Sequence, residues 1–63
     1  MKPEHYVSII RLNAQIIELQ NLAAYWMSIT DPSMFEEAAS ELVKLKVELA
    51  SLRMEQKAFL DDL

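Results

Sequence analysis

The sequence contains no glycine and no cysteine, and it has only two prolines, Pro3 and Pro32, and one histidine, His5. Tight β-hairpins and phosphate-binding loops depend on glycine, so its absence argues against β structure and against nucleotide binding. Without cysteine the chain forms neither a disulfide framework nor a thiolate metal site. A single histidine cannot build a zinc site alone. We therefore expect no metal site and no cofactor.

Basic residues are also scarce, since six lysines and arginines face ten acidic residues and the formal net charge is −4. An acidic surface repels phosphate, so we expect no nucleic-acid partner. No run of uncharged apolar residues is long enough to cross a membrane, and the N-terminus lacks the apolar segment of a signal peptide. A cytoplasmic location is the resulting expectation. No nucleophile is paired with a base, so we predict no catalytic residues and no enzyme activity.

What the chain has in abundance is apolar side chains, which make up 52% of its 63 residues. A single domain of this size, residues 1–63, buries only about 60% of its unfolded surface, which leaves a marginal core. Small domains compensate with disulfides, metals or oligomerisation. Because the first two are excluded by composition, the sequence favours oligomerisation.

Two helices and one break account for the whole chain. Pro3 suits the first turn of a helix, and no strong breaker follows until Pro32. The residue before a proline is pushed out of the helical region, so Asp31 is the favoured N-cap of a second helix. Ser33 with Glu36 offers an alternative capping box. The prediction is all-α, with a helix over about residues 3–28, a turn over about 29–32 and a helix over about 32–61.

Both predicted helices carry a stripe of mainly apolar residues at heptad spacing. The first stripe is His5, Ile9, Leu12, Ile16, Leu19, Ala23 and Trp26, and the second is Phe35, Ala38, Leu42, Leu45, Leu49, Leu52, Gln56, Phe59 and Leu63. A short turn makes the helices antiparallel neighbours. The resulting layers are Trp26–Phe35, Ala23–Ala38, Leu19–Leu42, Ile16–Leu45, Leu12–Leu49, Ile9–Leu52 and, at the open end, His5–Gln56. The predicted architecture is an antiparallel helical hairpin.

One seam leaves a second set of apolar residues unburied. The interface candidates are Tyr6, Ile10, Ile17 and Ala24 in the first helix and Val43, Val47, Ala50 and Met54 in the second. The four residues of the first helix lie about 100° around that helix from its seam, which is the rotation of one residue. The four residues of the second helix lie about 150° from the seam of that helix. The favoured interpretation is a homodimer that pairs two hairpins into a four-helix bundle. A groove for a different protein, as in a scaffold or adaptor, is the alternative.

Charged residues beside the second seam support a rival arrangement. Glu41, Glu48, Glu55 and Asp62 occupy g positions, and Lys46 and Arg53 occupy e positions. Such flanks suit a parallel coiled coil through the second helix. That pairing would leave the apolar stripe of the first helix uncovered, so a solvated face beside the hairpin seam is the favoured interpretation.

Aromatic residues and methionines gather near the turn, a composition that is enriched in binding hot spots. Trp26 and Phe35 are expected in the core. Tyr25 faces the polar arc of its helix and Met34 borders the turn, so these two are further candidates for a partner contact.

The complete chain resembles a small early protein of lambdoid bacteriophages, the 63-residue product encoded between the exonuclease and excisionase genes. The resemblance lies in the length, in the opening Met1 to Val7, in the following Ile9, Ile10, Arg11 and Leu12, and in the all-helical pattern. It implies an accessory protein made early in infection, acting in the host cytoplasm on a host or phage protein. That gene region is associated with host take-over and the lytic–lysogenic balance. The resemblance carries over no functional residues.

The predicted hairpin also resembles the RNA-binding hairpin dimers that control plasmid copy number. Those proteins use basic residues clustered on their first helix. Here the first helix offers Lys2 and Arg11, with His5. The resemblance implies a shared architecture, but the charge disfavours RNA binding.

Overall fold

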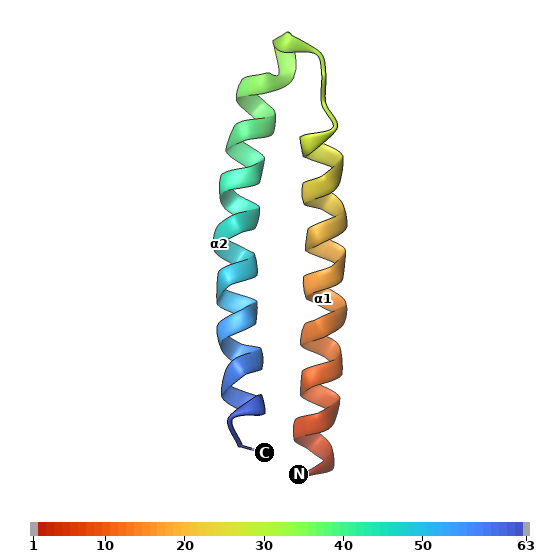
Figure 1. Ribbon diagram of the computed structural model, residues 1–63, viewed down its shortest axis with the longest axis vertical. Helices are drawn as coiled ribbons and strands as arrows, with labels where there is room; N and C mark the ends of the chain where they lie inside the picture. Colours follow the sequence, from red (N-terminus) through yellow and green to blue (C-terminus); the bar gives the residue numbers. More distant parts are fainter. Residues whose placement is uncertain (1, 63) are drawn as a thin grey trace.

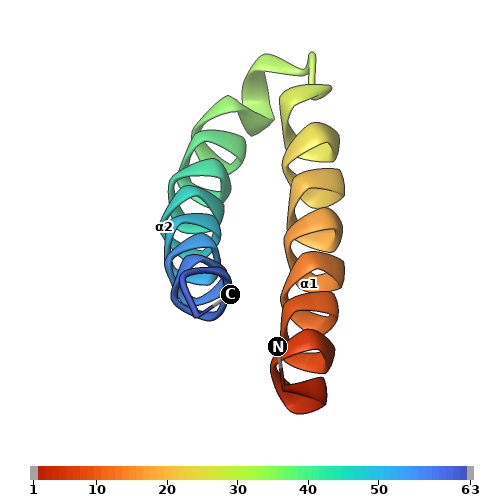
Figure 2. The ribbon, with the colours of Figure 1, turned by 60° about the horizontal axis from the view of Figure 1, so that its bottom comes forward.

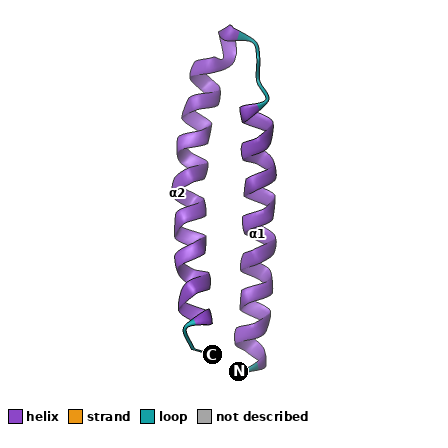
Figure 3. Ribbon diagram, in the orientation of Figure 1, coloured by secondary structure: helices purple, strands orange, loops and turns teal. Residues whose placement is uncertain are grey.

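The computed structural model describes residues 2–62 as two long helices joined by one turn (Figure 1). Helix α1 spans Pro3–Met27, a short 3-10 turn η1 spans Pro32–Met34, and helix α2 spans Phe35–Leu60. The helices lie side by side in both views, and the start of α1 and the end of α2 lie at the same end of the hairpin, opposite the turn (Figures 1 and 2). Colouring by secondary structure shows helix and loop alone over the described residues (Figure 3). The predicted all-α antiparallel hairpin is confirmed.

The limits of α1 follow from its end residues. Pro3 opens the helix, where a missing N–H has no cost, and Ser8 Oγ donates a hydrogen bond to the carbonyl of Glu4 over 3.0 Å. At the other end, the backbone N–H of Ser28 donates to the carbonyls of Ala24 and Tyr25, each at 3.1 Å. Ser28 Oγ also donates to the carbonyl of Tyr25, at 2.6 Å. The observed helix therefore agrees with the predicted residues 3–28 to within one residue.

Asp31 is the N-cap of the 3-10 turn η1, whereas the sequence predicts it as the N-cap of the second helix itself. Its backbone is extended (φ −79°, ψ 115°), as expected for a residue before proline, and its carboxylate accepts from the Ser33 N–H at 3.0 Å. The Ser33 hydroxyl donates to the same oxygen at 2.9 Å. Ser33 thus serves the Asp31 cap and not the alternative box with Glu36. Because Pro32–Met34 form a 3-10 turn, α2 begins at Phe35, three residues later than predicted.

The core lies on the predicted seam and is small. Among residues 2–62 the buried apolar side chains are Leu12, Ile16, Ala38 and Leu45, and each is 5–8% exposed. The neighbouring seam residues Ile9, Leu19, Ala23, Leu42, Leu49 and Leu52 are half-buried. Two helices alone leave one side of every layer open, so no large side chain is completely enclosed.

The layer pairing, however, differs from the predicted one. The His5 ring packs against Phe59, with ring centroids 5.4 Å apart, and its Nδ1 lies 3.7 Å from Asp62 Oδ2. Phe59 is three residues beyond Gln56, the residue with which the sequence pairs His5. The predicted His5–Gln56 layer is therefore wrong by about half a heptad. The loop after α1 rises beyond the end of that helix before α2 begins (Figure 1), which moves every α2 residue toward the turn.

The same shift changes the residues beside the turn. Phe35, predicted in the core opposite Trp26, is 51% exposed, whereas Ala38 is 6% exposed. Phe35 therefore lies beyond the last layer that α1 contributes, and its predicted core position is wrong. Trp26 is half-buried and its indole Nε1, although buried, has no hydrogen-bond acceptor.

Candidate protein-binding surfaces

The hairpin exposes more large apolar side chains than it buries. All eight predicted interface residues are exposed, and their six large side chains are 48–74% accessible. We call Tyr6, Ile10, Ile17 and Ala24 the α1 stripe, and Val43, Val47, Ala50 and Met54 the α2 stripe. Large contiguous apolar patches on a protein surface are typical of interaction sites, which makes the two stripes candidates for such sites. The hairpin by itself covers neither stripe.

The two stripes face different directions. At about 100° of rotation per residue, the α2 stripe points about 160° away from Ala38 and Leu45, which face α1. It therefore lies on the side of α2 that is farthest from α1. The α1 stripe points about 115° from Leu12 and Ile16, toward one broad side of the hairpin. One flat partner surface cannot cover both stripes, so the eight candidates form two surfaces.

A groove with basic edges borders the α1 stripe. It has a volume of about 360 Å³ and is lined by Ala23, Met27, Leu42, Leu45, Lys46, Leu49, Ala50 and Arg53. We call it the basic groove, because Lys46 and Arg53 are the charged residues of its lining. Ala50 of the α2 stripe also belongs to this lining, so that stripe reaches the groove at this one residue. Met27 follows Ala24 by three residues and so continues the α1 stripe into the groove wall. The stripe and the groove together form one apolar side of the hairpin.

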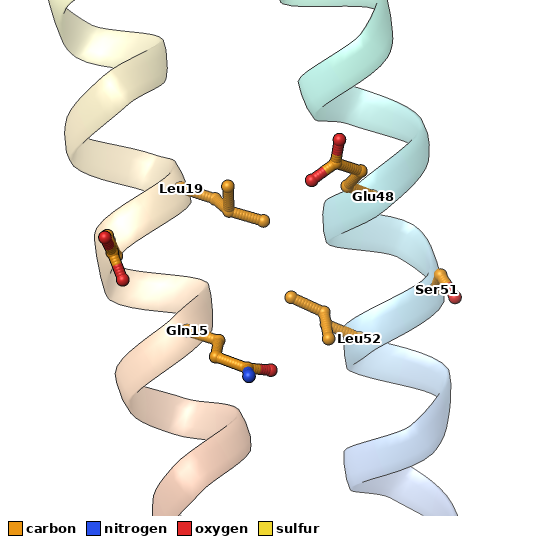
Figure 4. Close-up of a pocket in the computed structure, with 6 residues that line it drawn as sticks. Gln15, Leu19, Glu48, Ser51 and Leu52 are labelled. Atoms are coloured by element: carbon orange, nitrogen blue, oxygen red, sulfur yellow. The ribbon is translucent and has the colours of Figure 1, made fainter.

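A second groove lies along the opposite side of the seam. Its volume is about 440 Å³ and its lining is Gln15, Glu18, Leu19, Glu48, Ser51 and Leu52. Leu19 and Leu52 point toward one another from the two helices, while Gln15 and Glu48 point into the space beside them (Figure 4). We call this the acidic groove, because Glu18 and Glu48 supply its charges. The two broad sides of the hairpin therefore differ in the sign of their charge.

Sequence spacing identifies two further exposed residues on the basic side. Phe35 precedes Leu42 by seven residues and Leu60 follows Arg53 by seven, so both lie on the same flank of α2 as the basic groove. Phe35 is 51% and Leu60 is 45% exposed. The sequence prediction missed this role, because it assigned Phe35 to the core and did not assign Leu60.

The candidates near the turn differ in accessibility. Tyr25 is exposed and its ring meets that of Trp26 edge to face, with centroids 5.2 Å apart. Met34 lies in the 3-10 turn and is half-buried. Tyr25 is therefore free for a contact with another molecule, while part of Met34 already packs within the hairpin.

The charged residues of α2 form few contacts within the chain. Lys44 Nζ lies 3.4 Å from Glu41 Oε1 one turn away, an exposed pair that contributes little to stability. Because α1 covers Ala38 and Leu45, the seam of α2 is already occupied. A parallel coiled coil through those same positions would have to displace α1 from them.

Within residues 2–62, no three His, Asp or Glu side chains come together as a metal site would require, and neither helix has a stretch apolar and long enough to cross a bilayer. No family model matches the chain, and neither a curated protein nor a solved structure does. The surfaces of the hairpin are therefore the features from which a function can be inferred.

Proposed function

We propose that this chain is a small accessory protein that acts through protein–protein contact, and that it works as a homodimer in which two hairpins form a four-helix bundle. The observation that carries the proposal is the balance of apolar residues. Four apolar side chains are buried within the described hairpin, whereas twelve large ones are at least 43% exposed. A second copy of the chain is the simplest surface that can cover the α1 stripe.

The dimensions of the hairpin suit this role. Its long face measures 49 × 15 Å, which is comparable to the roughly 800 Å² that each partner buries in a stable interface. Burial of apolar surface stabilises by about 25 cal/mol per Å². A bundle of four helices would enclose the layers that two helices leave open on one side, and so would supply the core that the single chain lacks.

The biological setting of the proposal comes from the resemblance of the sequence to lambdoid phage early proteins. On that basis the protein is a non-enzymatic regulator made early in infection, active in the host cytoplasm during host take-over or in the lytic–lysogenic balance. The exposed α2 stripe and Tyr25 provide surface for a host or phage protein.

The oligomeric state tests the proposal directly. Sedimentation equilibrium at micromolar concentration should give the mass of two chains of 7.3 kDa each. The measurement should be repeated over a hundredfold dilution series to obtain the dimer dissociation constant. A monomeric mass throughout that series would overturn the homodimer.

A scaffold or adaptor function is the second candidate, and the direction of the α2 stripe favours it. Val47 and Met54 are 65% and 74% exposed on the side of α2 that faces away from α1. A surface there stays accessible when the other side of the hairpin is covered. Photo-crosslinking from position 47 in cells should yield adducts with a different protein, whereas crosslinking from position 17 should yield adducts of two copies of the chain. Self-adducts alone from position 47 would argue against the adaptor.

A further inference from the structure

We infer that each copy in the dimer packs its α1 stripe into the basic groove of the other copy, around a two-fold axis parallel to the helices. Both turns then lie at the same end of the bundle. This inference rests on the proposed homodimer and adds its symmetry, its register and the residues in contact. Two hairpins can join these sides in one other symmetric way, in which the two-fold axis is perpendicular to the helices. In that arrangement α1 packs on the α1 of the other copy, and α2 packs on the α2 of the other copy.

The α1 side of this contact is apolar with two polar positions. Between Ile10 and Ala24, the heptad positions that complete the stripe are Asn13 and Gln20, which are seven residues apart and exposed. No charged residue occurs at the stripe positions from Tyr6 to Met27. A partner for this side must therefore be apolar, with two hydrogen-bonding groups separated by two helical turns.

The basic flank of α2 has the matching pattern. Leu42 and Leu49 line the groove, and the two cations Lys46 and Arg53 are again seven residues apart. The long stems of both cations cover apolar surface while their charged ends donate hydrogen bonds. An amide oxygen accepts such bonds without bringing a like charge. The spacing of the amides on α1 therefore equals the spacing of the cations on α2.

The register of the hairpin places these groups opposite one another. Rotation about an axis parallel to the helices moves no residue along that axis, so the level of α1 against the partner's α2 equals its level against its own. Within one chain His5 is level with Phe59. Counting along the antiparallel helices from that pair makes Asn13 level with Ser51 and Gln20 level with Lys44, so Arg53 and Lys46 lie two residues, or about 3 Å, from the levels of the two amides.

The apolar residues follow the same register. When Asn13 is opposite Arg53, Ile17 is opposite Leu49 and Ala24 is opposite Leu42. At the open end, Tyr6 is opposite Leu60, which is 45% exposed in the single hairpin. The register set by the turn thus pairs apolar with apolar residues and amides with cations, except that Ile10 falls opposite Gln56. This pairing differs by two residues, or about 3 Å, from the level set by His5 and Phe59, which is less than one helical turn.

The perpendicular two-fold axis gives a poorer match. It places α2 against the partner's α2, so that Lys46 and Arg53 of both copies line one helix–helix contact, with no acidic residue in the groove lining. Like charges juxtaposed in an interface are strongly unfavourable. It also pairs the amides of α1 with one another and leaves the cations without acceptors. The charge distribution therefore selects the parallel axis.

Distances between spin labels separate the two arrangements, and the absence of cysteine allows single labels to be introduced cleanly. Thr30→Cys places a label beside the turn, and Glu4→Cys places one near the open end; both residues are exposed. With the parallel axis, both label pairs should be separated by less than about 30 Å, the width of a four-helix bundle with its labels. With the perpendicular axis, both pairs should be separated by about the 49 Å length of the hairpin.

The outcomes for the inference and for the proposed function are distinct. Long distances at both positions in a dimer would overturn the parallel axis but leave the homodimer intact. A monomeric mass would overturn both, and would leave the basic groove to an acidic helix of a different protein. As an independent test that needs no label, Lys46→Glu should weaken the dimer at least several-fold by removing the cation from Gln20. Tighter association of this variant would indicate Lys46 facing Arg53 of the other copy, and would overturn the inference.

Discussion

Lys46 and Glu48 are two residues apart on α2, yet Lys46 lines the basic groove and Glu48 lines the acidic groove on the opposite side of the hairpin. Two residues correspond to about 200° of helical rotation, so the side chains point to opposite flanks of the seam. Arg53 and Glu18 join them on the basic and acidic sides respectively. This separation of charge makes the two sides of the hairpin unequal as binding surfaces.

The α1 stripe and the α2 stripe offer a matched pair of substitutions. Ile17→Glu should raise the dimer dissociation constant at least a hundredfold, because two buried isoleucines per dimer are lost at about 1.5–3 kcal/mol each. Val47→Glu introduces the same charge at a residue that is also exposed in the hairpin (65%, against 48% for Ile17) but faces away from α1, and should leave the constant within a factor of about three. Sedimentation equilibrium measures both. Dissociation by Val47→Glu with an intact Ile17→Glu dimer would place the interface on the α2 stripe.

The core can be tested by removing its most buried side chain. Leu45 is 5% exposed, and Leu45→Ala should lower the free energy of unfolding by about 2–5 kcal/mol, since it removes packed methyl groups from a core with few others. Val43→Ala, at a residue 63% exposed, should change it by about 0.5 kcal/mol or less. Urea unfolding followed by circular dichroism gives both values. Equal effects would contradict the assigned core.

The Asp31 cap determines where the second half of the chain begins. Asp31→Ala removes the acceptor for both the backbone N–H and the hydroxyl of Ser33, and should destabilise the protein by about 0.5–2 kcal/mol. Asp31→Asn retains an acceptor oxygen and should recover most of that loss. Thermal unfolding compares the two, with Thr30→Ala as the control for an exposed turn residue that makes no such bond. A cap without importance would leave all three variants alike.

Charge also predicts what the protein does not bind. Its net charge is −4, and α1 and its cap carry Lys2 and Arg11 as their basic residues. Structured RNA at physiological salt should therefore give no retarded complex in a gel-shift experiment at micromolar protein. Glu18→Lys with Glu48→Lys reverses the charge of the acidic groove and serves as a positive comparison. A retarded complex with the unmodified protein would favour an RNA-binding hairpin.

Much of this fold could be predicted from the order of residues alone. Heptad spacing identified the seam, because any residue that repeats every three or four positions returns to the same side of a helix. Pro3 predicted the start of α1, and Asp31 and Pro32 predicted the break between the helices, since proline and its predecessor restrict the backbone locally. The α1 and α2 stripes were likewise predicted as exposed surfaces. These features depend on neighbours within about one or two turns of helix.

The layer pairing, by contrast, depended on the tertiary structure. A heptad seam slipped by half a heptad still presents apolar residues to its partner, so spacing alone cannot distinguish His5 opposite Gln56 from His5 opposite Phe59. The path of the loop and the 3-10 turn at Pro32–Met34 decides between them. That path exposes Phe35 and brings Lys46 and Arg53 to within two residues of the levels of Gln20 and Asn13. Local sequence thus determined the two helices and their apolar sides, and the geometry of one turn decided how those sides meet.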